Sequence, residues 1–204
     1  GQSTIHEWPE KTANEAELVE RLNAQLENAP RQSWPESFSK WGGWNNLQFE
    51  GTGFYRTHHD GKRWWLADPD GYAYWSHGID CVRSIIDTSI EGLENALEWI
   101  PEESGKFGEG FFRRNGSPGC SFLAPNFIKA FGEDWYEEWM DITVSELKRY
   151  GVNTIANWSE WEKLREKQFP YVRPLAKGDG KAPMVFRDLP DVFTSEFEED
   201  AKDF

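Results

Sequence analysis

The sequence predicts an α/β fold in which helices cover a parallel sheet, and three observations support it. From Tyr72 onward, strand-like and helix-like segments alternate three times. Such alternation is typical of a parallel sheet, either closed into a barrel or open and doubly wound. No strand leads into a glycine-rich phosphate-binding motif, which disfavours the nucleotide-binding doubly wound folds. We therefore predict a (β/α) barrel, preceded by a helix and an antiparallel β-meander.

Composition and charge narrow the class of partner. The chain has 204 residues, with 36 acidic against 22 basic side chains and a net charge of -14. A surface this negative repels phosphate backbones and anionic lipids, so we expect neither nucleic acid nor membrane as a partner. No apolar stretch is long enough to span a bilayer. The 12 Trp and 14 Phe residues argue against disorder and suit a neutral sugar polymer as ligand.

The N-terminal part predicts one amphipathic helix over 12–28. Thr12 and Glu15 have the spacing of a capping box, and Pro30 follows the helix. Its leucines recur at every fourth residue, at Leu18, Leu22 and Leu26. We treat 1–51 as a helical and irregular N-terminal extension.

The strongest β signal runs from Phe54 to Asp80. Asp60-Gly61 and Asp70-Gly71 separate aromatic, β-prone runs, and each pair is typical of a type I′ turn between antiparallel strands. The third run, 72–80, is apolar first and polar at its end, as in a buried strand that delivers polar groups at its tip. Strand tryptophans are expected to build the core: Trp64, Trp65 and Trp75.

A long connection, about 81–132, follows this strand. Thr88 and Glu91 predict a capped helix with Leu93, Leu97 and Ile100 on one face, and a glycine-rich loop comes after it. Long loops in compact domains are usually functional or mobile. The two cysteines, Cys81 and Cys120, could form one disulfide or stay free.

The remaining elements complete the alternation. A helix over about 133–150 ends at Gly151, which suits a left-handed C-terminal cap. A β-type run over 152–158, a helix near 160–168 and a strand over 171–175 come next. The chain ends in a helical pattern over 194–204.

Barrel active sites lie at the carboxyl ends of the strands, and this rule selects the candidate ligand residues. The first strand ends at His77 and Asp80, and the second at Asn157, Trp158 and Glu160. Asp80 and Asn157 can exchange hydrogen bonds with hydroxyl groups, and the Trp158 ring offers a flat apolar face to a sugar. Each also has a structural alternative: Asn157 would tie down a loop, Trp158 would pack in the core, and Glu160 would cap the following helix.

Two longer blocks resemble agarase-type glycoside hydrolases of family 50. They are Asp60–Asp80, with its Asp-Gly-Lys-Arg-Trp-Trp-Leu-Ala-Asp-Pro-Asp-Gly run, and Leu147–Ser159. A weaker similarity covers Leu189–Phe193, and the whole resemblance covers roughly 52–204. It implies that 52–204 is an incomplete catalytic domain. This domain would hold the meander and the first three βα units of a partial (β/α)8 TIM barrel, with strands near 73–79, 152–157 and 171–175.

The resemblance also implies an activity and where its chemistry lies. Such enzymes cleave agarose-type galactans by a retaining mechanism with two glutamates, after the fourth and seventh strands. Three βα units do not reach those strands, so the resemblance implies no catalytic residue in this chain. It implies a secreted or periplasmic enzyme without a cofactor. No His, Cys, Asp and Glu cluster has metal-ligand spacing, so no metal is expected.

Partners and rival functions follow from the incomplete barrel. The exposed edge of a partial sheet invites pairing, so we expect a second polypeptide or fragment that completes the barrel, beside the polysaccharide or oligosaccharide substrate. Two alternatives stay open: a non-catalytic carbohydrate-binding module, and a structural subunit that makes no sugar contact at Asn157 or Trp158.

Overall fold

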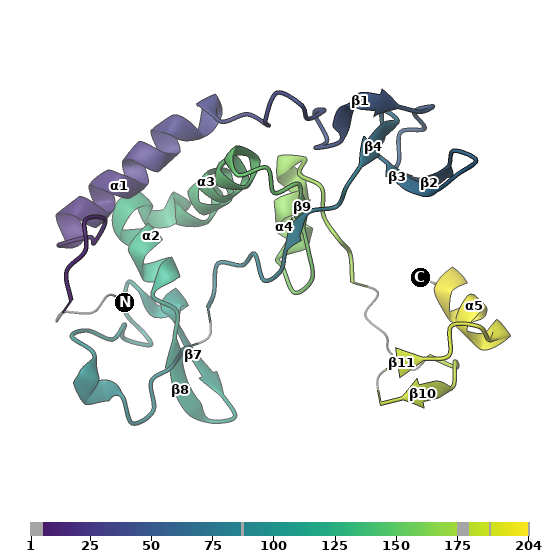
Figure 1. Ribbon diagram of the computed structural model, residues 1–204. Coiled ribbons are helices and arrows are strands. Elements are labelled where there is room, and N and C mark those ends of the chain that lie inside the picture. The colour runs from purple at the N-terminus through teal and green to yellow at the C-terminus, as the bar shows by residue number, and fades with distance from the viewer. Residues whose placement is uncertain (1–5, 87, 175–179, 188, 204) are drawn as a thin grey trace. The chain divides into compact units, whose positions relative to one another are not determined.

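The computed structural model describes residues 6–86, 88–174, 180–187 and 189–203 (Figure 1). The chain divides into two compact units, 1–172 and 173–204. The larger unit holds the helices of the core, two antiparallel sheets and the parallel strands. The smaller unit is a hairpin followed by one helix.

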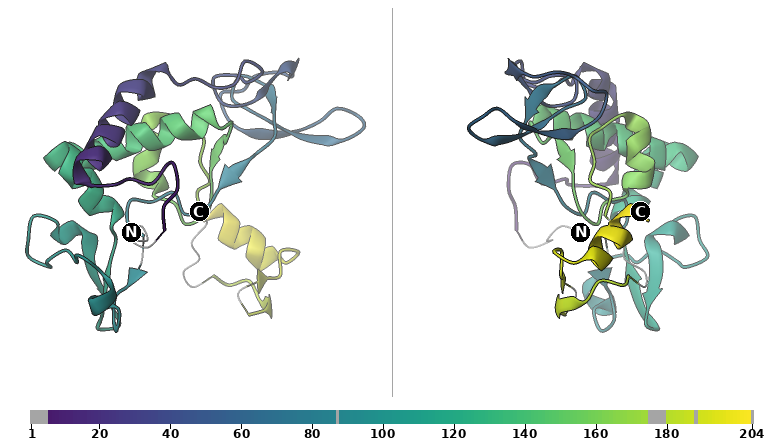
Figure 2. Two further views of the ribbon diagram at one scale, coloured as in Figure 1. Left: turned by 60° about the vertical axis from the view of Figure 1, so that its left-hand side comes forward. Right: turned by 90° about the vertical axis from the view of Figure 1, so that its right-hand side faces the viewer.

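Helix α1 (Glu15–Asn28) confirms the predicted N-terminal helix but not its cap. The Asn14 side chain accepts a hydrogen bond from the backbone N–H of Glu17 at 3.0 Å. Because Asn14 precedes the first helical residue, it, rather than Thr12, satisfies the free N–H groups of the first turn. The Glu17 carboxylate reaches back to the N–H of Ala13 at 2.6 Å. Helix α1 lies beside α2 and α3 (Figure 2). Its Leu22 is buried in the core, and Leu18 and Leu26 pack against that core.

The predicted meander forms, with one strand added. Strands β2 (Arg56–His59), β3 (Trp64–Ala67) and β4 (Tyr72–Tyr74) pair antiparallel in sequence order. Strand β1 (Trp44–Gln48) pairs with β4 across an irregular register, so the sheet order is β1-β4-β3-β2. The irregular segment before Gly51 therefore contributes an edge strand to the same sheet.

Neither hairpin turn is of the predicted type I′, which needs positive φ at both central residues. In the β2–β3 turn only Gly61 has a positive φ, +92°, and Lys62 does not. The Asp60 carboxylate holds this turn by accepting hydrogen bonds from the Trp65 indole, at 2.7 Å, and from the N–H groups of Lys62 and Arg63. These bonds, the indole first, hold the pKa of Asp60 at about 2.

The second turn has three residues between Asp68 and Tyr72, the two residues that close it. The Asp68 N–H donates the closing hydrogen bond to the Tyr72 carbonyl. In this turn Gly71 alone has a positive φ, +93°. This is the pattern of a three-residue hairpin with a bulge at the glycine. The buried Asp68 carboxylate accepts bonds from the N–H groups of Asp70 and Tyr72 and from the Ser39 hydroxyl, which fastens the turn to the preceding loop.

Two of the three strand tryptophans are not core residues. Trp64 is 71% exposed and Trp75 is 85% exposed. Trp64 lies on the outer face of the sheet, and Trp75 follows the end of β4, where the chain leaves the sheet. Period-two patterning alone could not show which face of this sheet other elements cover.

The predicted strand 72–80 is divided between two sheets. Its first part is β4, and its last part is β5 (Gly78–Ile79), which pairs in parallel with β9 (Thr154–Ile155). Ile155 also makes a parallel bridge to Tyr171, with bonds from Ile155 N–H to Pro170 O and from Val172 N–H to Ile155 O. Three successive segments therefore run in parallel, in the order 78–79, 154–155, 170–172. Residue 175, the end of the third predicted strand, lies outside the described residues.

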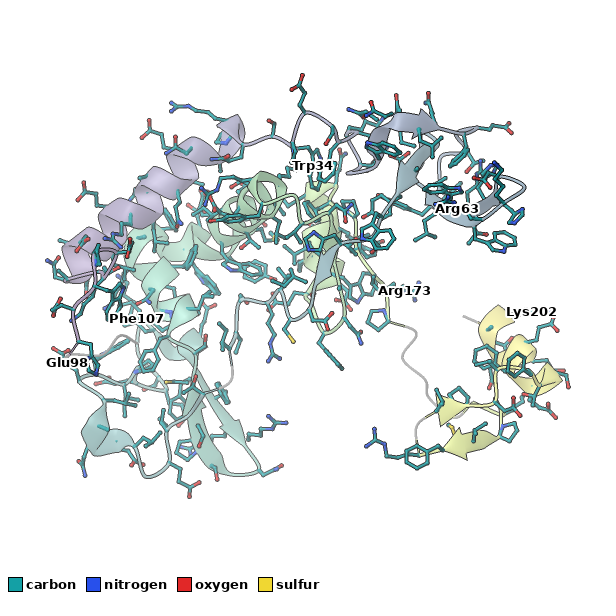
Figure 3. All side chains as sticks on the ribbon, in the orientation of Figure 1. Trp34, Arg63, Glu98, Phe107, Arg173 and Lys202 are labelled. Atoms are coloured by element: carbon teal, nitrogen blue, oxygen red, sulfur yellow. The ribbon has the colours of Figure 1, made fainter. Side chains whose placement is uncertain are left out.

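Helices cover this parallel arrangement and form the core. Helix α3 (Trp135–Arg149) connects the first parallel segment to the second, after α2 (Leu123–Phe131) and a 3₁₀ turn (Gly132–Asp134). It ends at Gly151, whose φ of +68° confirms the predicted left-handed cap. Helix α4 (Trp161–Leu164) and a 3₁₀ turn (Arg165–Lys167) connect the second segment to the third. Trp34, labelled in Figure 3, stacks on Phe169 at the edge of this core.

The helix predicted after Thr88 does not form. Residues Thr88–Ser89 are strand β6, which joins β7 (Phe111–Arg114) and β8 (Ser117–Cys120) in the order β6-β8-β7. Gly92 has φ +76°, which no α-helix accepts, and Leu93 is exposed. Only short 3₁₀ turns follow, at Glu94–Ala96 and Gly108–Gly110. The segment therefore folds by pairing with a hairpin of the glycine-rich stretch, which was predicted as a loop.

The smaller unit confirms the final helix. Strands β10 (Met184–Phe186) and β11 (Leu189–Pro190) pair antiparallel, and α5 (Ser195–Lys202) begins where the Thr194 hydroxyl accepts the Phe197 N–H. Asp200 of α5 accepts the N–H groups of Lys181 and Ala182, which ties the helix to the strand entrance. Both cysteines are free, Cys81 exposed and Cys120 buried. Within the described ranges, no helix is long and apolar enough to span a membrane.

Candidate functional site

The carboxyl ends of β5 and β9 bring two predicted ligand residues together. The parallel ladder continues beyond both strands, with bonds from Ala156 N–H to Ile79 O and from Cys81 N–H to Asn157 O, each 2.9 Å. One carboxylate oxygen of Asp80 accepts the Asn157 N–H at 2.9 Å. The Asp80 carboxylate therefore lies against the backbone of Asn157 at one edge of the parallel arrangement, the edge predicted from strand polarity.

The residues that follow Asp80 and Asn157 have strained backbone conformations. Cys81 and Trp158 have φ values of +60° and +57°, in the left-handed region that non-glycine residues avoid. Each such residue costs on the order of 1–3 kcal/mol and persists where its surroundings over-determine it. Here the Val82 N–H donates to the Ser159 hydroxyl and the Glu160 N–H to the Val82 carbonyl, both at 3.0 Å.

The strained geometry presents the Trp158 indole to solvent. Its side chain is 67% exposed, so the structural alternative, in which Trp158 packs in the core, is wrong. Strain of this kind clusters at ligand sites, where it fixes a side chain in a useful orientation. An exposed aromatic ring close in sequence to a polar side chain is typical of ligand sites, because apolar groups of a ligand can stack on the ring while its polar groups bond to the polar atoms.

Glu160 lies behind this edge and is fully engaged. One of its carboxylate oxygens accepts the Ser84 N–H at 2.8 Å and the Ser84 hydroxyl at 2.9 Å, and the other accepts the Tyr136 hydroxyl. Burial and this carboxylate raise the pKa of Tyr136, so its phenol stays a proton donor. The side chain does not cap α4, although Glu160 occupies the cap position. Glu160 thus connects the loop after β5, helix α3 and the start of α4.

His77 lies at the opposite end of the parallel strands from the other predicted ligands. It precedes β5, and its carbonyl accepts the N–H groups of Asn153 and Thr154 at the start of β9. At about 3.3 Å per residue, three residues separate it from Asp80 by roughly 10 Å along the strand. The predicted grouping of His77 with Asp80 at the carboxyl end of one strand is therefore wrong. Strand β5 begins after His77, so His77 lies at its amino end and Asp80 at its carboxyl end.

Asn153 is the residue that the sequence analysis missed. It is 2% exposed, its side-chain oxygen accepts the His77 N–H at 2.8 Å, and its amide group donates to the carbonyls of Gly42 and Trp75. A Cβ atom on Gly42 would lie 2.6 Å from the Asn153 Cβ, so glycine is required at this approach. The available signal was a polar residue inside a short β-type run, because buried polar groups need partners.

A second buried group, Tyr74, joins the same network. Its hydroxyl donates to the Asn153 carbonyl at 2.6 Å and lies 2.8 Å from the Thr154 hydroxyl. Burial raises the pKa of Tyr74 to about 12. Asn153 and Tyr74 thus fasten the amino ends of β5 and β9 to the antiparallel sheet, and so fix the strands that carry Asp80 and Asn157.

The site has groups for binding and shows no metal centre. The Asn157 amide, the Trp158 indole N–H and the half-buried Arg83 guanidinium make no recorded polar contact within the part of the chain that the structure describes, so all three can bind a ligand. No group of three or more His, Cys, Asp and Glu side chains could hold a metal ion among those same residues.

Comparison with known proteins shows which proteins this chain is similar to. No protein-family model matches the chain. Beta-agarase B of Vibrio sp. (strain JT0107) is 26% identical over 202 residues, an alignment that covers 84% of this chain and 21% of that protein. The crystal structure of an agarase, AgWH50C, superposes with a TM-score of 0.76 and 25% identity, over 98% of this chain and 33% of the agarase. The structure of PfGH50B superposes with a TM-score of 0.71 and 26% identity, over 99% of this chain and 35% of that protein.

The chain therefore spans about a fifth of the length of the curated relative and about a third of the solved structures. The similarity extends over helices, antiparallel sheets and parallel segments alike, since nearly the whole chain superposes. In sequence and in fold, the chain is similar to part of the length of these agarases.

Proposed function

We propose that this chain is the N-terminal part of a glycoside hydrolase that cleaves an agarose-type galactan. The observation that carries the proposal is the superposition of 98% of the chain on a solved agarase at a TM-score of 0.76. The division into an extension, 1–51, and an incomplete catalytic domain, 52–204, is part of the proposal. A polymer of this kind lies outside the cell, so the enzyme would be secreted or periplasmic.

The barrel in this proposal is the (β/α)8 TIM barrel, of which the chain supplies the first three βα units. Three parallel segments in sequence order, connected through α3 and α4, support it. Strands of a barrel have two neighbours each, whereas β5 has β9 alone among the described residues. Apolar side chains of the outer segments are exposed, including Ile79, Tyr171 and Val172. We propose that a further polypeptide segment, on this or another chain, covers them.

The catalytic pair of a retaining mechanism would come from that further segment. Retaining hydrolysis needs two carboxyl groups roughly 5–5.5 Å apart, one protonated and one ionised. At the strand ends described here, both Glu160 oxygens accept hydrogen bonds from Ser84 and Tyr136, and Asp80 bonds to the backbone of Asn157. These carboxylates are engaged in holding the site, so we assign them no catalytic step.

The roles of the strand-end residues follow from their geometry. Trp158 would stack on a sugar ring, and the free oxygen of Asp80 and the Asn157 amide would bond to its hydroxyl groups. We assign Glu160 a positioning role, because its carboxylate holds Ser84 and Tyr136. A purely structural subunit would keep the same fold but bind no sugar through Trp158.

The test uses agarose with the isolated chain and with the complete polypeptide. We expect no release of reducing sugar by the 204-residue chain alone, and release by the polypeptide that includes the later strands. In the latter, Trp158→Ala should lower kcat/KM about tenfold or more, equal to about 1.4 kcal/mol of lost transition-state stabilisation. Trp64→Ala, which removes an exposed ring far from the strand ends in sequence, is the matched control.

Hydrolysis by the isolated chain would show that the catalytic pair lies within it. Unchanged kcat/KM in Trp158→Ala, with the fold intact by circular dichroism, would favour the structural subunit. Failure of the complete polypeptide to cleave any galactan would refute the proposed substrate class.

A further inference from the structure

A cavity lies at the amino ends of β5 and β9, opposite the strand ends that carry Asp80 and Asn157. Its volume is about 340 Å³, and Trp44, Trp75, Phe38, His77 and Asn153 line most of it. This volume is within the range of small-ligand sites, which start at about 300 Å³.

Two exposed indole rings border the cavity without serving the core. Trp75 is 85% exposed and Trp44 is 46% exposed. Trp75 gains little from the hydrophobic effect in the fold and Trp44 keeps almost half of its surface exposed, so burial energy of both rings remains available for a ligand. Trp44 is on edge strand β1 and Trp75 follows β4, and these strands are adjacent, so the rings come from neighbouring strands.

The polar part of the cavity combines one free group with a rigid support. The His77 imidazole makes no recorded hydrogen bond within the described ranges, so its nitrogens can exchange bonds with hydroxyl groups. The Asn153 amide group, by contrast, is used up in bonds to the Gly42 and Trp75 carbonyls, and its oxygen in a bond to the His77 N–H. Asn153 therefore fixes the backbones of both Trp75 and His77 before any ligand binds.

Charge restricts the ligand to a neutral one. Among the residues that the structure describes, none that lines the cavity is a lysine, arginine, aspartate or glutamate, and the chain as a whole carries a net charge of -14. An anion would meet repulsion without a cationic partner, and a cation would lack a carboxylate. Flat aromatic walls with one imidazole and no charge fit the apolar C–H face and the hydroxyl groups of a sugar ring.

We propose that this cavity is a second carbohydrate-binding site, which binds a neutral sugar unit of a polysaccharide between Trp44 and Trp75, with His77 as hydrogen-bond partner. It would bind the polymer at the end of the strands opposite Trp158. The choice of agarose as probe rests on the proposed function, whereas the cavity itself does not.

The experiment measures binding of the 204-residue chain to agarose particles, from the protein left in solution over a series of particle concentrations. All cavity variants are made in the Trp158→Ala background, so that the strand-end site no longer contributes. Trp75→Ala and His77→Ala should each weaken binding, by about tenfold for the indole. Trp64→Ala in the same background is the matched control, because Trp64 is 71% exposed but does not line the cavity.

The variants should fold, because Trp75 is exposed and the His77 bonds in the fold come from its backbone. Circular dichroism checks this, and Trp75→Phe should restore part of the affinity by keeping a ring. The inference is overturned if Trp158→Ala alone abolishes binding, if Trp64→Ala weakens binding as much as Trp75→Ala, or if neither cavity variant has an effect. Absence of all agarose binding by the unaltered chain also overturns it, and leaves the proposed hydrolase to be judged by the cleavage assay.

Discussion

Replacement of Asn153 by aspartate tests whether the buried amide is the anchor of the parallel strands. Asn153→Asp changes no shape but turns the amide nitrogen into an oxygen. That nitrogen donates to the Gly42 carbonyl at 2.8 Å and to the Trp75 carbonyl at 2.9 Å. After the change, a carboxylate oxygen would face two carbonyl oxygens at a position that is 2% exposed.

The expected loss follows from these contacts. Two hydrogen bonds of about 1 kcal/mol each disappear, and their buried acceptors stay unsatisfied at about 1–3 kcal/mol in total. These losses together come to about 3–5 kcal/mol and desolvation of the new charge adds to them, so the free energy of unfolding should fall by at least about 3 kcal/mol at pH 7. This is a large share of the about 5–15 kcal/mol that holds a typical domain together.

The pH dependence has a definite sign. Burial and the facing carbonyls raise the pKa of the introduced carboxyl in the folded state above the unfolded value of about 3.9. The folded variant therefore binds its proton at higher pH than the unfolded chain. Relative to the unaltered chain, the variant should regain stability as pH falls below the raised value, and the recovery should level off near pH 4.

Urea unfolding followed by tryptophan fluorescence at pH 7.5 and pH 5 measures both effects. Asn157→Asp is the matched control, the same substitution at the other end of β9, where the amide has no recorded partner among the described residues. The cost should be smaller than at Asn153, because this half-buried side chain gives up no recorded hydrogen bond. A loss below about 1 kcal/mol for Asn153→Asp, or a deficit that does not shrink at low pH, would refute the anchoring role.

Three further predictions concern stability. Tyr74 has a pKa of about 12 in the fold against 10.0 for the free side chain, so the folded state keeps this proton to higher pH than the unfolded chain does. The free energy of unfolding should therefore fall by about 3 kcal/mol between pH 10 and 12. Tyr74→Phe should show a smaller decline when urea unfolding is measured over this pH range. Glu160→Gln keeps the shape of the side chain but replaces an acceptor by a donor toward Ser84 or Tyr136, so the free energy of unfolding should fall by about 1–2 kcal/mol. An unchanged free energy of unfolding would contradict the positioning role of Glu160. Gly151→Ala places a Cβ at φ +68° and should lower the melting temperature at a cost of about 1 kcal/mol, whereas an unchanged melting temperature would show that the left-handed cap is not needed.

Predictions based on local patterns succeeded where one segment decides its own structure. Helix α1 follows from leucines at every fourth residue, and the cap at Gly151 follows from the tolerance of glycine for a left-handed φ. The helix predicted after Thr88 failed, although its capping and spacing looked helical, because pairing with Cys120 and Gly119 in the β8 hairpin outweighed propensity. Tertiary pairing routinely overrides weak helix propensities.

The candidate site divides in the same way. Strand polarity was enough to place Asp80 beside Asn157, because parallel strands end at the same edge of a sheet. The position of His77 depended on where β5 begins, which only its pairing with β9 defines. The partners of Asn153 and Glu160 are likewise more than 70 residues away in sequence, or in another helix, so no local pattern could reveal them.

The sequence by itself determined the periodicity of the main helices, the alternating order of elements and the polarity that places Asp80 and Asn157 at the same edge of the parallel strands. Only the tertiary structure decided which tryptophans are exposed, which strand continues into which sheet, and which polar groups are satisfied. The physical reason is that periodicity and backbone preference act within a few residues, whereas burial and hydrogen-bond satisfaction depend on segments that meet only after folding.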